Sequence, residues 1–202
     1  MGAAASVPDE RKAAAIGMSL LYQMLVVIAR RLAIEGTGER TAAHGISIGA
    51  APREQLEFVF GKDEDGDPLF GRIQNPMFDF REQRIALDSD EGWSRLQVCA
   101  RDDGMIVVTP NEAGTGFELV CGKYFVTDTS KGTGPANAGG RHLATSAFAK
   151  KLHTLAIKVS EDACGHSENV IQAAHMKVFW RTNEAKDWPV HAEVREARAD
   201  DG

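Results

Sequence analysis

A single uncharged stretch constrains this chain more than any other feature of its sequence. It runs from Ala13 to Ala29 without one charged side chain, and basic pairs at residues 11–12 and 30–31 flank it. On a helical wheel of residues 9–34, polar side chains form one narrow stripe and apolar side chains cover most of the rest. A helix with this pattern is buried on most of its sides. We therefore expect it to lie in the core of a domain.

Three other interpretations of the uncharged stretch compete with a core helix. A membrane span needs about 20 apolar residues, and this stretch is shorter and interrupted by polar side chains, so we expect no membrane insertion. A signal peptide carries basic residues before its apolar stretch, whereas this chain has Asp9 and Glu10 there, so we do not expect a signal peptide. The third alternative buries the surplus apolar face of the helix against a second copy of the chain. Its candidate interface residues are Leu21, Met24, Leu25 and Ile28.

Signals for the ends of this helix lie outside the uncharged stretch. Ser6 is a candidate N-cap, and Pro8 and two acidic residues follow it in the first turn. Gly36 and Gly38 signal the end of the helix. Residues 1–6 also match the pattern for N-myristoylation, although we interpret them as a frayed terminus.

Length and composition are those of one ordinary globular domain. The 202 residues include 43% hydrophobic and 26% charged side chains, which is enough to build one core. We expect a single domain over residues 1–202, with frayed ends at 1–8 and 193–202. The net charge of −6 argues against nucleic acid as a partner, because affinity for phosphates depends on basic groups.

The cysteines indicate a reducing environment. Cys99, Cys121 and Cys164 are too few and too widely spaced for a disulfide framework. We therefore expect buried, reduced thiols and a cytoplasmic protein. In an exported protein, a Cys99–Cys121 bridge between adjacent strands is the alternative.

The middle of the chain has the pattern of an antiparallel sheet. Short segments in which apolar and polar residues alternate are separated by turn signals, among them Asp65-Gly66 and residues 112–116. We expect an α+β fold, in which about six or seven antiparallel strands pack against the apolar N-terminal helix and one or two C-terminal helices. The predicted strands are residues 55–60, 69–74, 84–88, 94–100, 105–109, 117–121 and 123–127, with 75–83 as a crossing loop.

The C-terminal part of the chain predicts at least one helix against this sheet. Apolar residues at 148, 152, 155 and 159 indicate an amphipathic helix over residues 145–159. The next segment is ambiguous, because residues 167–178 fit a helix and residues 177–182 fit a strand.

A glycine-rich loop at residues 129–141 is the best candidate for a binding site. It lies between a predicted strand and a predicted helix, where backbone amides and the helix N-terminus can hold an anion. The loop lacks the complete dinucleotide and P-loop signatures, and a loop that binds nothing is the competing interpretation. The candidate ligand-binding residues are Gly132, Gly134, Gly139, Gly140, Arg141 and His142.

Two clusters offer metal-ligand chemistry without the spacing of established sites. A calcium loop that began at Asp63 would lack the glycine and the glutamate required at its sixth and twelfth positions, so we interpret this segment as a hairpin turn. Cys164, His166 and His175 supply three ligands where structural zinc uses four. We therefore expect no metal and no cofactor.

Protein interaction is the function that these patterns favour. The N-terminal helix is too apolar for an exposed surface, and no nucleophile, base and orienting acid converge in the sequence. We expect a self-associating structural or regulatory module with a homo-oligomeric or other protein partner. The alternative is an enzyme or sensor that binds a phosphorylated small molecule at residues 131–142. A concave pocket there favours the alternative, and a flat apolar face favours self-association.

Overall fold

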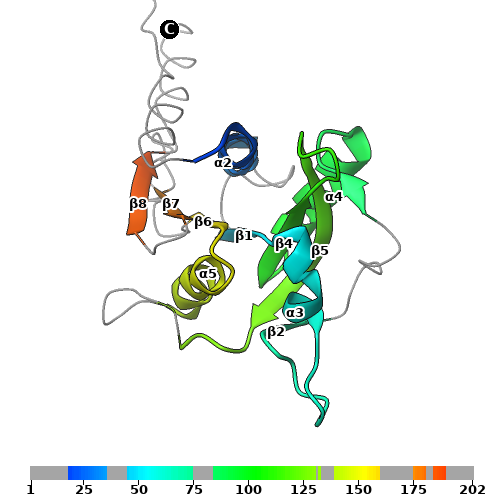
Figure 1. Ribbon diagram of the computed structural model, residues 1–202. Coiled ribbons are helices and arrows are strands. Elements are labelled where there is room, and N and C mark those ends of the chain that lie inside the picture. The colour runs from blue at the N-terminus through cyan, green and yellow to red at the C-terminus, as the bar shows by residue number, and fades with distance from the viewer. Residues whose placement is uncertain are drawn as a thin grey trace, which may run out of the picture.

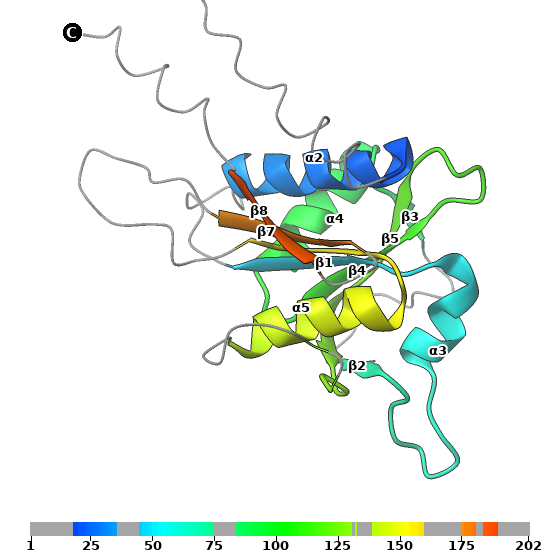
Figure 2. The ribbon, with the colours of Figure 1, turned by 60° about the vertical axis from the view of Figure 1, so that its left-hand side comes forward.

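The fold is a sheet between two layers of helices, in the residues that the computed structural model describes: 18–35, 45–74, 84–130, 132, 139–159, 175–180 and 184–189. Helices α2 (Leu20–Glu35) and α4 (Asp90–Ala100) cover one face of the sheet. Helices α3 (Leu56–Phe60) and α5 (Gly140–Lys151) cover the other, and the short turn η1 (Arg53–Gln55) leads into α3. The two layers are visible in Figure 1 and, from another side, in Figure 2.

The sheet is mixed rather than purely antiparallel. Its strands are β1 (Ile46–Ala50), β2 (Gly71–Ile73), β3 (Ile85–Ala86), β4 (Met105–Pro110), β5 (Phe117–Val126), β6 (Leu155–Val159), β7 (His175–Trp180) and β8 (Glu184–Pro189). Seven of them lie in the order β2-β5-β4-β1-β6-β7-β8, and β3 pairs with β5. The central strands β1 and β4 are parallel, with Ile48 opposite Ile106, whereas the other pairs are antiparallel. The prediction of an antiparallel sheet is wrong here, because a long crossover through α4 separates β1 from β4.

The β4–β5 hairpin confirms the predicted strand at residues 105–109 and the extended structure of residues 117–121 and 123–126. Its turn closes where the N–H of Asn111 donates to the carbonyl of Gly116 at 2.9 Å. The two predicted segments 117–121 and 123–127 form one strand, β5, which continues through Gly122. A Cβ atom at Gly122 would lie only 2.8 Å from the Sγ atom of Cys99, so glycine lets α4 approach the strand closely. The shorter strands β2 and β3 lie within the predicted segments 69–74 and 84–88.

Residues 94–100, predicted as a strand, belong to α4. The Oγ atom of Ser89 accepts a hydrogen bond from the N–H of Gly92 at 3.0 Å, which caps the helix. Asp90 and Glu91 follow in the first turn, where the helix dipole favours negative charge. This start signal outweighs the apparent alternation of the residues that follow.

Residues 55–60 are also helical rather than extended. The chain turns through η1 directly after Pro52 and continues into α3. Leu56 and Val59 are buried, which is the three-residue spacing of a helix face. The segment is too short for its apparent period of two to distinguish a strand from a helix.

The predicted helix over residues 145–159 is wrong in its second half. Helix α5 begins at Gly140 and ends at Lys151, and His153 reverses the chain in the left-handed region with φ 48°. Leu155–Val159 then form β6 beside β1. Four of its five residues are buried, so the strand lacks the polar alternation that identifies a strand covered on one face only.

Helix α2 contributes one face to the core. Its buried side chains belong to the same core cluster as residues of the sheet and of α4: Leu25, Val26, Ala29 and Leu32. No helix among the described residues is long and apolar enough to cross a bilayer. The predicted cap Ser6, the stops Gly36 and Gly38, the loop 75–83 and the ends 1–8 and 193–202 lie outside the described residues, as do residues 167–174. Residues 175–180 form a strand.

Candidate functional site

A pocket opens beside the N-terminus of α5, at one end of the central strands. Its volume is about 310 Å³. Met105, Tyr124 and Ala144 give it apolar walls, and the buried hydroxyl groups of Ser47 and Thr145 also line it. Strands β1, β4 and β5 supply three of these five side chains, and α5 supplies the other two. The pocket therefore combines an apolar interior with a few polar groups, as small-molecule sites do.

An ion pair lies at the mouth of this pocket. The Nη2 atom of Arg141 donates to Oδ1 of Asp103 at 2.9 Å, and the N–H of Gly104 donates to the same oxygen at 2.9 Å. These two hydrogen bonds, first that of Arg141, hold the pKa of Asp103 below its usual value. The Asp103 side chain is 76% exposed and that of Arg141 is 28% exposed. The arginine is therefore the more enclosed member of the pair.

Two hydroxyl groups line the buried part of the pocket. The Oγ1 atom of Thr145 donates to the carbonyl of Arg141 at 2.8 Å and lies 3.0 Å from the Oγ atom of Ser47. A carbonyl only accepts, so the single proton of Thr145 goes to it and Ser47 donates to Thr145. If Ser47 turns its proton toward a ligand, Thr145 keeps its own bond to the carbonyl. Ser47 can thus serve either as a donor or as an acceptor.

Of the predicted ligand-binding residues that the structure describes, two line the pocket, Gly140 and Arg141. Gly139 is the N-cap of α5, and no side chain caps the helix there. At Gly132, a Cβ atom would lie 2.6 Å from the carbonyl oxygen of Leu143, so this glycine serves close packing against α5. Gly134 lies outside the described residues.

His142, the last predicted ligand-binding residue, is buried and is not among the residues that line the pocket. Its ring meets the ring of Phe179 edge-on, with 5.2 Å between the centroids. The strand residues of the pocket carry no sequence signal of their own. Which strand ends lie next to α5 depends on the order of the sheet, and the sequence does not state that order.

The candidate interface residues on α2 differ widely in exposure. Leu25 is fully buried in the core, and Leu21 and Ile28 are half-buried against it. Met24 is 44% exposed, and two apolar neighbours that were not predicted are more exposed, Leu20 at 78% and Val27 at 53%. These three side chains form an exposed apolar row on α2, which lies on the outside of the molecule (Figure 2).

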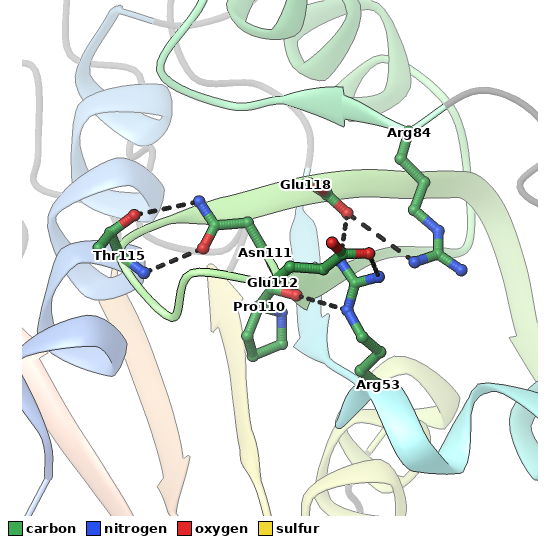
Figure 3. Close-up of polar contacts among 7 residues, drawn as sticks. All are labelled: Arg53, Arg84, Pro110, Asn111, Glu112, Thr115 and Glu118. Carbon is green, nitrogen blue, oxygen red and sulfur yellow. Dashed lines mark hydrogen bonds and ion pairs between the residues drawn. The ribbon is translucent and has the colours of Figure 1, made fainter.

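A polar cluster around Glu118 ties separate segments together (Figure 3). Arg53 reaches Glu118 at 2.9 Å and Glu112 at 3.3 Å, and Arg84 approaches Glu118 at 4.0 Å. Arg53 also donates from Nε to the carbonyl of Pro110 at 3.4 Å. Because each charge in Figure 3 has an opposite charge beside it, we interpret the cluster as a brace between η1, the residue that precedes β3 and the β4–β5 hairpin.

The segment that begins at Asp63 is a turn between α3 and β2. The carboxylate of Asp63 accepts the N–H groups of Asp65 at 3.0 Å and Asp67 at 2.9 Å, and Gly66 has φ 86°. The hairpin-type turn is confirmed, although it follows a helix rather than a strand. Within the described part of the chain, no three His, Cys, Asp or Glu residues form a group that suits a metal ion. Cys164 and His166 lie outside that part.

Cys99 and Cys121 are free and buried. Burial raises the pKa of Cys99 to about 11, and it raises the pKa of Cys121 further. Both thiols are therefore protonated at neutral pH and are poor nucleophiles. Cys99 lies on α4, so the premise of a bridge between adjacent strands was wrong.

Comparison with known proteins gives no indication of what these sites do. No protein-family model matches the chain. No curated protein matches it either. The arrangement of the described residues is accordingly the basis for the proposals below.

Proposed function

We propose that this protein is a self-associating structural or regulatory module, in which α2 of one copy packs against α2 of a second copy. The observation that carries the proposal is the exposed apolar row of Leu20, Met24 and Val27. The opposite face of the same helix already lies in the core. A contiguous exposed apolar surface of this kind favours contact with another protein surface.

The spacing of the row suits a second helix. Leu20, Met24 and Val27 are four and three residues apart, and this is the spacing of a seam between two packed helices. Arg31 continues the spacing at the far end, where its guanidinium lies 4.2 Å from the centre of the Trp93 ring. In an antiparallel pair, the two copies of Arg31 stand at opposite ends of the seam. A two-fold axis across the helices produces this arrangement and keeps like charges apart.

The extent of the row sets the expected affinity. Helix α2 has 16 residues, which corresponds to a length of about 24 Å. A pair of such helices alone buries less than the roughly 1,000 Å² of a stable specific interface. We therefore expect reversible dimers with a dissociation constant of about 1 to 100 μM.

Sedimentation velocity over about 1 μM to 1 mM protein tests the proposal. We expect the dimer fraction of the unaltered protein to rise with concentration, and Met24→Glu and Val27→Glu to remain monomeric. Leu69→Glu is the matched control, because Leu69 is 44% exposed, as Met24 is, but lies in the turn after α3. Circular dichroism confirms the folding of each variant.

Two results would overturn the proposal. One is an unaltered protein that stays monomeric over the whole concentration range. The other is a dimer that Met24→Glu and Leu69→Glu weaken to the same degree, since the contact would then not depend on α2.

A further inference from the structure

We propose that the pocket beside the N-terminus of α5 binds a small monoanionic carboxylate with an apolar body. The proposal is independent of self-association, because the pocket and α2 lie on opposite sides of the sheet. It also changes the chemistry expected at the glycine-rich loop, from a phosphorylated ligand to a carboxylate.

The interior of the pocket suits an apolar body. Tyr124 lines it but presents its ring, because its hydroxyl already donates to the carbonyl of Val59 at 2.6 Å. Met105 and Ala144 supply further apolar surface. A volume of about 310 Å³ lies at the lower end of the range for ligand sites, so the occupant is small.

The mouth of the pocket suits one negative charge. Arg141 presents a planar guanidinium, which holds a carboxylate through two parallel hydrogen bonds. Asp103, one partner of this guanidinium, is 76% exposed and turns into solvent at little cost, since exposed ion pairs contribute about 0–1 kcal/mol. A ligand carboxylate inside the pocket thus replaces this exposed partner with a better-shielded one.

The same charges disfavour a phosphate dianion. Even when its carboxylate turns into solvent, Asp103 stays near the mouth of the pocket, where its charge opposes a second negative charge on the ligand. Lys123, another cation on β5, already lies 3.2 Å from Asp102. The first turn of α5 adds the positive end of one helix dipole, equivalent to about half a charge. Arginine and dipole together therefore match one negative charge better than two.

The hydroxyl pair gives the bound molecule a second polar contact. Ser47 is buried beside Thr145 and can donate to a ligand oxygen without leaving Thr145 unpaired. A carboxylate between Arg141 and Ser47 has donors on two sides. This contact selects for an acceptor group on the ligand rather than for an entirely apolar molecule.

Three probes with one ring and different head groups test the proposal: benzoate, phenyl phosphate and benzyl alcohol. Binding is followed by backbone amide shifts in two-dimensional NMR of the full chain, up to about 10 mM probe. We expect benzoate to shift the amides of Gly140, Arg141 and Ala144 and to bind at least tenfold more tightly than the other two probes. Inorganic phosphate alone serves as the competitor that reports simple anion binding.

Variants locate the site. Arg141→Met keeps the stem of the side chain and should weaken benzoate at least tenfold, and Ala144→Leu should abolish binding by filling the pocket. Arg53→Met removes a cation far from the pocket and should leave binding unchanged. Tighter binding of phenyl phosphate than of benzoate would overturn the carboxylate preference. The absence of shifts at the pocket with every probe, in protein whose spectrum shows it is folded, would overturn the site itself.

Discussion

The Nη2 atom of Arg53 lies 2.9 Å from the Oε2 atom of Glu118, across 65 residues of the chain. Glu118 is 21% exposed and also faces Arg84, so its charge is partly shielded from water. We expect Glu118→Gln to lower the free energy of unfolding by about 1 kcal/mol. Glu112 also contacts Arg53 but is 87% exposed, so Glu112→Gln should stay within about 0.5 kcal/mol of the unaltered protein. Chemical denaturation measures both, and equal losses would contradict the brace.

Two positions on α2 separate its buried face from its exposed face. Leu25 is fully buried, so Leu25→Asp places an unpaired charge in the core and should cost several kcal/mol, a large part of the ~5–15 that stabilises a domain. Val27 is 53% exposed, so Val27→Asp should change the stability of the monomer by less than about 1 kcal/mol. Soluble yield and thermal unfolding compare the two. If the Leu25→Asp protein folded normally, residue 25 would not lie in the core.

Local patterns in the sequence account for the segments that the prediction placed correctly. The β4–β5 hairpin has alternating side chains and a turn in which Asn111 meets Gly116, and both signals are local. Ser89, Asp90 and Glu91 form a recognisable helix start, but α4 was not predicted because the segment was assigned from alternation alone. Strand β6 was missed for a different reason. It is covered on both faces, and a short apolar run of this kind fits helix and strand equally well.

Long-range order sets the limit of what could be predicted. The parallel pairing of β1 with β4 depends on the crossover between them, and the residues of the two strands do not by themselves indicate this pairing. The candidate site shows the same division. Gly140 and Arg141 were identified from a glycine-rich segment before a helix, whereas Ser47 and Tyr124 reach the pocket through the order of the sheet.

We expect the protein to lose stability at alkaline pH, because two thiols and one phenol are buried in their protonated form. Burial raises the pKa of Cys99 from 9.0 to about 11, and also raises the pKa of Cys121 and Tyr124. The folded state retains protons that the unfolded chain releases above pH 9. Its stability is therefore full below pH 9 and falls as the pH rises toward 11, by up to about 1.4 kcal/mol per pH unit for each group.

Cys99→Ala isolates one of these groups. The free energy of unfolding, measured with reductant between pH 8 and about 10.5, should depend less steeply on pH in the variant than in the unaltered protein. The space left by the smaller side chain lowers stability at every pH and does not alter that slope. Identical slopes would show that Cys99 titrates normally in the folded protein.

Two buried threonines should respond differently to substitution by valine. The Oγ1 atom of Thr154 donates to the carbonyl of Ala50 at 2.6 Å, whereas Oγ1 of Thr109 is buried without a hydrogen-bond partner in the described structure. Valine has the shape of threonine without the hydroxyl, so Thr154→Val should cost about 1–3 kcal/mol through the bond lost at Ala50. Thr109→Val removes only an unsatisfied polar group and should be neutral or stabilising by about 1 kcal/mol. Urea denaturation of both variants measures the contrast. Equal destabilisation would mean that Thr109 has a partner after all, and the absence of a loss in Thr154→Val would mean that the bond to Ala50 contributes nothing to stability.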